Sequence, residues 1–280
     1  MQEQAIIPYI VNVSSIPNRS IFRYPGGKTW LVPIIRKWLP ANNDIQLIEP
    51  FCGGGIVGLT AAAENRVCQA TLIEKDPDVA AAWHTLLDDP DWLIDRILHF
   101  RMTTEQINVE ENRRPATLQE KGFQTILRNR THHGGILAQG AGRIKAGENG
   151  KGLSSRWYPD TLAKRISSIA AYRSKIKFHE GDAFDYITAA QDRSDTYFFI
   201  DPPYTVAGKR LYTYSTIDHE LLFQRVAAFK NAHYLISYDK SDLIESLVQK
   251  YHLCAKVIPM RTNKLTSKEE ILISDTFAWL

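Results

Sequence analysis

Long hydrophobic runs are missing from this 280-residue sequence, and none approaches the roughly 18 residues needed to cross a bilayer. The N-terminal segment also lacks the basic start and small-residue cleavage site of a secretory signal. We therefore expect a soluble cytoplasmic protein that makes no membrane contact. Hydrophobic residues make up 44% and charged residues 23% of the chain. This composition is ordinary for a globular protein and suffices for one sizeable core, or for one core plus a smaller module.

Cysteine is also scarce, with only Cys52, Cys68 and Cys254, far apart in the chain. No CxxC pair and no Cys/His cluster occurs, so neither a zinc site nor a disulfide framework is expected. We expect each cysteine to be a small buried hydrophobic residue.

The net charge is low, at +3, but the charged residues are unevenly distributed along the chain. Residues 121–159 contain seven Lys or Arg and one acid, about +6, which leaves about −3 for the rest of the chain. The same segment holds eight of the sixteen glycines. A basic, glycine-rich segment in a mildly acidic protein favours a polyanionic partner. The alternative is a surface loop that is basic by chance.

Periodicity predicts a chain of alternating helices and strands. Short apolar segments predict strands at 45–48, 70–73, 176–179, 197–200, 234–237 and 271–274. Helical spacing predicts helices at 29–39, 56–65, 79–87, 161–172 and 221–231, with a polar helical stretch at 91–120. The resulting fold class is α/β, with a parallel sheet covered by helices on both faces. We expect the catalytic domain at 1–100 and 161–280, with an insertion at 101–160.

A glycine-rich turn follows the first predicted strand. Gly53, Gly55 and Gly58 fit the G-x-G-x-x-G pattern between a strand and a helix, where glycines let a ligand approach the backbone. Glu74 ends the next strand, 19 residues after Gly55, and is well placed to bind ribose hydroxyls. By itself this pattern fits a nicotinamide enzyme as well as an S-adenosylmethionine enzyme, and also close packing without a ligand.

The most apolar strand runs directly into Asp201-Pro202-Pro203-Tyr204. Two prolines fix the backbone and end the strand, so the carboxylate and the ring are held at the carboxyl end of the sheet. An exocyclic amine on a base needs a hydrogen-bond acceptor and a flat surface to stack on. Asp201 and Tyr204 supply both, and the motif predicts amino-group methylation without a covalent intermediate or a metal.

A third motif, Phe22-Arg23-Tyr24-Pro25-Gly26-Gly27-Lys28, ends like a phosphate loop. That loop would need a glycine where Phe22 stands, so we reject a nucleotide triphosphatase. An aromatic residue, two glycines and a lysine fit a segment that closes over a cofactor with a carboxylate.

Taken together, RYPGGK at 23–28, EPFCGGG at 49–55 and DPPY at 201–204 resemble the Dam-like, alpha-group DNA adenine-N6 methyltransferases. The resemblance covers about residues 20–275, and the basic segment occupies the place of that family's target-recognition region. It implies a Rossmann-like sheet, S-adenosylmethionine as the cofactor, and methyl transfer to adenine N6 in double-stranded DNA after base flipping. A cytosine-N4 or RNA amino-methyltransferase, an inactive nucleic-acid-binding relative and a nicotinamide dehydrogenase are the alternatives.

The resemblance also implies roles for individual residues. Catalysis falls to Asp201, Pro202 and Tyr204. Tyr24 takes the place of the family's usual tryptophan against the cofactor, Lys28 lies beside the methionine portion, and Asp182 contacts the adenine ring of the cofactor. Asp76 competes with Glu74 for the ribose. The full expected cofactor set is Tyr24, Gly27, Lys28, Glu49, Phe51, Gly53, Gly55, Glu74, Asp182 and Asp201.

For DNA we expect contacts from the basic segment. The candidates are Arg128, Arg130, Arg143, Lys145, Lys151 and Arg156. Most should contact phosphates and one or two should read guanines. We expect a monomer or weak dimer, associated with the nucleoid through DNA, with a cognate restriction endonuclease as a possible partner.

Overall fold

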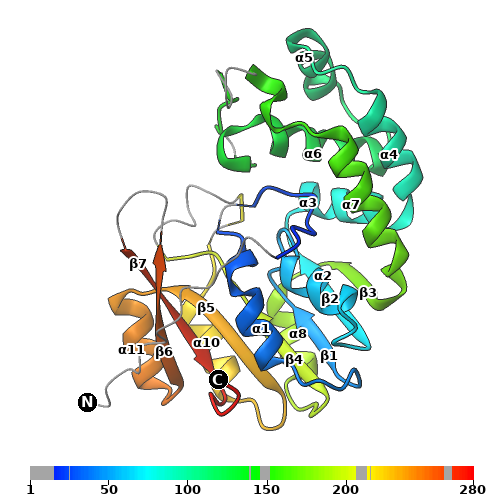
Figure 1. Ribbon diagram of the computed structural model, residues 1–280. Coiled ribbons are helices and arrows are strands. Elements are labelled where there is room, and N and C mark those ends of the chain that lie inside the picture. The colour runs from blue at the N-terminus through cyan, green and yellow to red at the C-terminus, as the bar shows by residue number, and fades with distance from the viewer. Residues whose placement is uncertain are drawn as a thin grey trace.

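A seven-stranded, mostly parallel sheet forms the centre of the computed structural model (Figure 1). The structure describes residues 16–24, 26–138, 140–145, 152–205, 213–214, 216–261 and 267–280. The strands are β1 (Gln46–Glu49), β2 (Gln69–Glu74), β3 (Ile176–Glu180), β4 (Thr196–Ile200), β5 (His233–Asp239), β6 (Cys254–Arg261) and β7 (Ser267–Ser274). Their order is β3-β2-β1-β4-β5-β7-β6, and only β7 runs antiparallel to its two neighbours.

The central strands are apolar because both of their faces are covered. Leu47 and Phe199 belong to the core on one face, while Ile48 and Phe198 belong to the core on the other. The strand order reverses between β1 and β4, which is where ligands bind in open α/β sheets. The α/β, Rossmann-like sheet expected from the sequence is thus confirmed.

Helices cover both faces of this sheet. One face carries α1 (Val32–Trp38), preceded by the short 3-10 helix Lys28–Leu31, together with α2 (Ile56–Ala63) and α3 (Pro77–Asp88). The opposite face carries α8 (Ala183–Ala190), α10 (His219–Ala227) and α11 (Asp242–Lys250). Among the described residues, no helix is long and apolar enough to cross a membrane.

Four further helices form a separate layer beside the α3 end of the sheet domain (Figure 1). This helical unit comprises α4 (Pro90–His99), α5 (Thr104–Asn112), α6 (Leu118–Thr131) and α7 (Pro159–Ala171), with 3-10 turns at His133–Gly135 and Gly152–Arg156. Its aromatic centre is formed by Phe100, Phe123 and Trp157, whose ring centroids lie 5.3 to 6.2 Å apart. The unit extends beyond the insertion expected at 101–160, since α4 and most of α7 lie outside that range.

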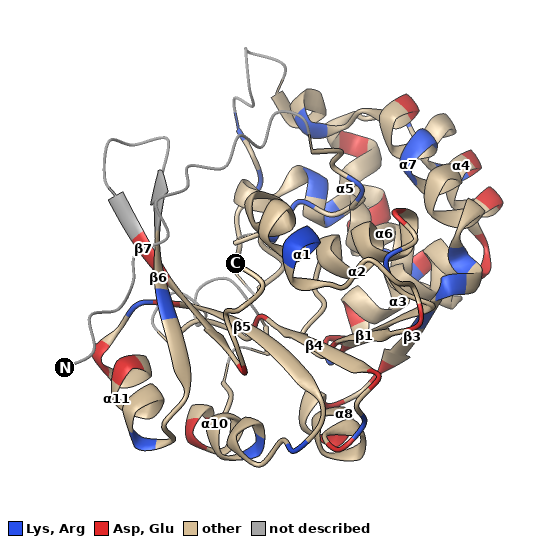
Figure 2. Cartoon of the chain, turned by 60° about the horizontal axis from the view of Figure 1, so that its bottom comes forward, with Lys and Arg blue, Asp and Glu red and all other residues tan. Residues whose placement is uncertain are grey.

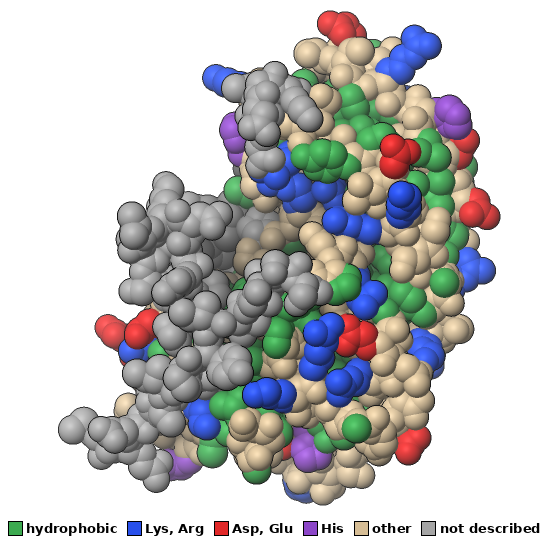
Figure 3. Space-filling model, in the orientation of Figure 1, with side chains coloured by type: hydrophobic (Ala, Val, Ile, Leu, Met, Phe, Trp, Pro, Cys, Tyr) green, Lys and Arg blue, Asp and Glu red, His purple; other side chains and the backbone are tan. Residues whose placement is uncertain are grey.

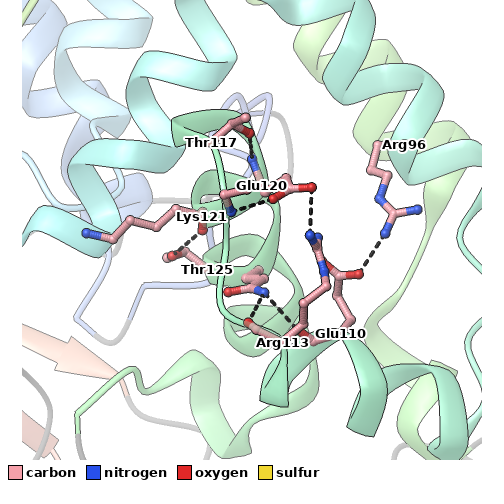
Figure 4. Close-up of polar contacts among 9 residues, drawn as sticks. Arg96, Glu110, Arg113, Thr117, Glu120, Lys121 and Thr125 are labelled. Carbon is pink, nitrogen blue, oxygen red and sulfur yellow. Dashed lines mark hydrogen bonds and ion pairs between the residues drawn. The ribbon is translucent and has the colours of Figure 1, made fainter.

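A buried carboxylate ties the helical unit together (Figure 4). Glu110 is only 4% exposed and accepts hydrogen bonds from Arg96 at 2.7 Å and from Arg113 at 2.9 Å. Arg113 also pairs with Glu120 at 2.6 Å, near the start of α6, where the Thr117 side chain caps the helix. The polar stretch at 91–120 is thus largely helical, as expected. Ion pairs of Glu110 and Glu120 with Arg96 and Arg113 hold its helices together.

Three expectations from the sequence are wrong. Residues 118–131 form α6, so a surface loop does not describe the first part of the basic segment. Cys52 is buried, but Cys68, directly before β2, and Cys254, at the start of the edge strand β6, are exposed. The helix expected at 221–231 ends at Ala227, after which the chain turns toward β5.

Candidate active site

A cavity of about 760 Å³ opens at the carboxyl edge of the sheet. Each of four strands ends at or just before a carboxylate residue that lines the cavity. Glu49 ends β1 and Glu74 ends β2, while Asp182 and Asp201 follow β3 and β4. Parallel strands end at the same edge, which is why residues more than 150 positions apart meet here. Figure 3 shows the hollow between the sheet domain and the helical unit, with Lys and Arg side chains gathered on the helical side.

The glycine-rich turn forms one wall of the cavity. Gly53 and Gly55 have positive φ angles of 45° and 61°. A Cβ on Gly53 would lie 2.5 Å from the Tyr24 ring, and one on Gly55 would lie 2.6 Å from the Trp83 ring. Trp83 also donates its indole N–H to the Gly53 carbonyl at 2.9 Å. Only glycine permits this close approach of the turn, the Tyr24 segment and α3.

Glu49 lies beneath the turn and is 3% exposed. Its Oε2 accepts the backbone N–H of Gly58 at 2.7 Å, across the first turn of α2. Burial, helped by the nearby Asp201 charge and opposed by the Gly58 hydrogen bond and by Lys28, raises the pKa of Glu49 to about 8. The carboxyl group is therefore close to half-protonated under mildly alkaline conditions.

Glu74 organises the other side of the turn. Its two oxygens accept three backbone N–H groups, from Gly53, Lys75 and Asp76, at 2.9 to 3.0 Å. Burial nevertheless raises the pKa of Glu74 to about 7. Asp76, the competitor for a ribose, uses its carboxylate to cap α3 through the Asp78 N–H at 2.9 Å.

Asp182 caps α8 by accepting the Phe184 N–H at 3.0 Å, and it pairs with Lys75 at 2.7 Å. These bonds lower its pKa in spite of partial burial. Asp182 is therefore an ionised acceptor at the end of the cavity beside β3.

Asp201 stands at the centre of the site. Its Oδ1 pairs with Lys28 Nζ at 2.8 Å and accepts the Ser237 hydroxyl at 2.9 Å. Its Oδ2 accepts no hydrogen bond from the described residues. Burial raises the pKa of Asp201, while Lys28 and Ser237 act in the opposite direction and favour the ionised form. The side chain remains 21% exposed, so a ligand in the cavity can reach the carboxylate.

Lys28 joins two motifs that lie far apart in the sequence. Its side chain is 3% exposed, and its ammonium group donates to the Gly26 carbonyl at 2.8 Å and lies 4.9 Å from the centre of the Tyr204 ring. The lysine of the RYPGGK segment is thus held between the acid and the aromatic ring of DPPY. The sequence led us to expect Lys28 against a cofactor, and its pairing with Asp201 is a contact that only the structure reveals.

All ten residues expected at the cofactor line this one cavity: Tyr24, Gly27, Lys28, Glu49, Phe51, Gly53, Gly55, Glu74, Asp182 and Asp201. Of the rest of the DPPY motif, Pro203 lines the cavity, whereas Pro202 and Tyr204 are not among its lining residues. The Tyr204 ring is tilted against the buried Tyr238, with ring centroids 6.4 Å apart.

The six residues expected to contact DNA differ in their burial and in their partners. Arg130 is buried, at 4% exposure, and lines the cavity. Arg128 pairs with Asp78 at 2.8 Å, and Arg143 pairs with Glu111. Arg156 is half-buried and Lys145 is exposed, while Lys151 lies outside the described residues. Both signs of charge alternate over the helical unit (Figure 2), since acids from outside the basic segment neutralise part of it.

Three residues of the site were not expected from the sequence. Ser237 holds Asp201, and Arg23 and Arg165 line the cavity beside Arg130. The sequence did contain a hint of Ser237, because it is a polar residue within the apolar strand predicted at 234–237, near the carboxyl end where ligands bind. Nothing in the sequence indicated that Arg165 belongs to the site, because it lies on a helix outside the basic segment.

Solved structures with a similar fold include two methyltransferases. The rRNA methyltransferase aviRa from Streptomyces viridochromogenes aligns over 95% of this chain and 94% of its own, at 12% identity and a TM-score of 0.41. The precorrin-6y C5,15-methyltransferase from Geobacter metallireducens GS-15 aligns over 95% and 93%, at 9% identity and a TM-score of 0.39. A search of the curated proteins found no match.

A family model gives the assignment. Residues 24–262 match the model of the D12 class N6 adenine-specific DNA methyltransferases, and they include the EPFCGGG and DPPY motifs and all of RYPGGK except its first residue. The match extends over most of the chain, from the RYPGGK segment to the end of β6. The chain belongs to the D12 class of DNA methyltransferases, which transfer a methyl group from S-adenosylmethionine to the N6 amino group of adenine.

Proposed function

We propose that this chain is an active, site-specific methyltransferase in which Asp201, Pro202 and Tyr204 carry out transfer to a flipped adenine. The single observation that carries the proposal is the state of Asp201: partly buried, held through Oδ1 by Lys28 and Ser237, with Oδ2 free of described partners. An ionised, fixed acceptor is what an exocyclic amine requires for orientation.

The cavity suits S-adenosylmethionine in size and in charge. Its volume lies within the range of cofactor pockets. Glu49 is buried and Glu74 is partly buried, and desolvation raises the pKa of both carboxyls, so a cationic ligand would stabilise their ionised forms. A Cβ on Gly53 would clash with the Tyr24 ring, so glycine at this turn lets that ring lie against the cavity wall. When bound, the cofactor supplies an electrophilic methyl group; Glu74 and Asp182 would hold its ribose and adenine.

The protein's own side chains bind and orient the target base. A base within a duplex must be flipped to reach Asp201. Asp201 Oδ2 and the Pro202 carbonyl would accept the two amine hydrogens, and Tyr204 would stack on the base, a contact worth about 1–3 kcal/mol in single-strand binders. Lys28 maintains the negative charge of Asp201 and holds Tyr204 in place from below. Positioning and electrostatics then supply most of the rate.

On the DNA side we propose that the helical unit faces the duplex, through Arg130 within the cavity and through Arg128, Arg143, Lys145, Lys151 and Arg156 around it. Arg128 and Arg143 would have to exchange their present carboxylates for phosphates. We further propose action as a monomer or weak dimer in the cytoplasm, with a restriction endonuclease as a cognate partner.

Two experiments test the proposal. Expression in a methylation-free host, followed by single-molecule sequencing, should reveal N6-methyladenine at one recurring sequence. Modified cytosine, or no modified base, would contradict it. With purified protein and tritiated S-adenosylmethionine, Asp201→Asn should lose at least about a hundredfold in kcat while cofactor binding persists. Asp192→Asn, an exposed position at the opposite edge of the sheet, is the matched control and should retain full activity.

A further inference from the structure

Three arginines from distant parts of the chain line the helical side of the catalytic cavity. Arg23 precedes the PGGK segment, Arg130 lies in the last turn of α6, and Arg165 lies in the middle of α7. Arg130 is 4% exposed and the other two are half-buried. They belong to the wall that faces the carboxylate-rich edge of the sheet.

These arginines have no acidic partner among the described residues. Arg130 donates to the carbonyl of Ile21, and Arg165 donates to the carbonyl of Ser20 at 3.1 Å. The buried Nε of Arg130 and the buried Nη1 of Arg23 have no hydrogen-bond partner. Each guanidinium carries five N–H donors in a fixed fork, so donors remain for a ligand.

The cluster is strongly cationic as well as incompletely paired. Burial, together with repulsion from Arg165, Arg23 and Arg156, lowers the pKa of Arg130 to about 9. Elsewhere in the helical unit, Arg128 has the carboxylate of Asp78 as its partner. Buried charges without a counter-charge destabilise a fold, so the arrangement is explained if an anion completes it.

Phosphate is the anion that fits this chemistry. The planar guanidinium fork matches phosphate oxygens in a bidentate manner, and three such groups exceed what one carboxylate can satisfy. The same cavity contains Asp201, where the target base would be held. A nucleotide whose base lies at Asp201 has its own phosphates attached, and these would lie within or beside the same cavity.

We propose that Arg23, Arg130 and Arg165 bind backbone phosphates of the DNA strand that carries the flipped nucleotide. The inference rests on the proposed DNA methylation and adds to it a phosphate site built mainly outside the basic segment. It also identifies one function for the N-terminal segment at 20–23: its carbonyls orient Arg130 and Arg165.

The test uses the double variant Arg23→Gln/Arg165→Gln, which leaves the more deeply buried Arg130 intact. Binding of duplex DNA is measured over a series of salt concentrations. Each lost phosphate contact should reduce the slope of log K against log salt by about 0.9, so the double variant should lose about 2. Affinity at low salt should fall at least about tenfold, for target and non-target DNA alike.

Two controls separate charge from folding. Arg225→Gln/Lys230→Gln removes the same charge from exposed positions at and after the end of α10 and should leave the slope unchanged. Arg23→Lys/Arg165→Lys retains the charge and should restore most of the slope. The thermal midpoint is measured for every variant.

The outcomes are distinct. An unchanged slope in the glutamine variant, with an unchanged midpoint, would overturn the phosphate site and leave the arginines a purely structural role. Loss of S-adenosylmethionine affinity instead of DNA affinity would assign them to the cofactor and likewise overturn it. If the wild-type protein neither bound nor methylated DNA, the proposed function itself would fail.

Discussion

Replacing Glu49 by Gln should change how the stability of this protein depends on pH. Glu49 is buried below the glycine-rich turn and accepts the Gly58 N–H. Glutamine is similar in size and keeps an acceptor oxygen, but it cannot ionise. The substitution therefore removes the titration while preserving the main contact.

The magnitude follows from the pKa of Glu49, which rises from 4.5 in the unfolded chain to about 8 in the fold. Between these values the folded state retains a proton that the unfolded state has released. Stability contributed by this group is thus fully present below pH 4.5 and is lost as the pH rises toward 8. Each pH unit in that window costs about 1.4 kcal/mol, so the complete effect is about 5 kcal/mol.

Urea denaturation at pH 5, 6, 7 and 8 measures the difference between variant and wild type. We expect Glu49→Gln to gain stability relative to wild type with increasing pH, reaching several kcal/mol at pH 8. Glu180→Gln, at an exposed carboxylate that ends β3, serves as the control and should show no such trend. A difference that stays constant within about 0.5 kcal/mol from pH 5 to 8 would refute the reasoning, since Glu49 would then be equally ionised in both states.

Three further substitutions test other contacts. Ser237→Ala removes a hydrogen bond that lowers the pKa of Asp201, so the acid limb of the pH–rate profile should move to higher pH while cofactor binding is retained; an unmoved limb would contradict this. Gly55→Ala forces a Cβ into the Trp83 ring at positive φ, and urea denaturation should show a loss of about 2–4 kcal/mol. Glu110→Ala removes the carboxylate partner of Arg96 and one of the two carboxylate partners of Arg113 in the helical unit. The loss should cost about 2–3 kcal/mol by the same assay, with a loss below 0.5 kcal/mol as the opposing result.

Much of the fold could be predicted because its signals are local. The strands at β1, β2, β4 and β5 are short apolar runs, and a parallel sheet buries both faces of such runs. The helix α3 begins at a capping Asp76 followed by Pro77, a sequence signature of a helix start. In contrast, α8 and α11 were not expected, because their short amphipathic patterns are hard to distinguish from loops.

The basic segment illustrates the limit of counting charge along a chain. Arg128 and Arg143 look available in the sequence, yet Asp78 and Glu111 pair with them from outside the segment. Arg165 looks like an ordinary helix-surface residue, yet α7 brings it to the cavity. Electrostatic partners are neighbours in space, and sequence distance says little about them.

The sequence alone determined the chemistry, because RYPGGK, EPFCGGG and DPPY carry the residue types that bind a cofactor and orient an amine, each beside a recognisable strand or turn. The tertiary structure decided how these motifs act on one another: Lys28 reaches Asp201, Ser237 fixes the same carboxylate, and burial shifts the pKa values of Glu49 and Glu74. The physical reason is that hydrogen bonds and desolvation depend on distances of a few ångströms, and only the folded chain brings these distant residues that close.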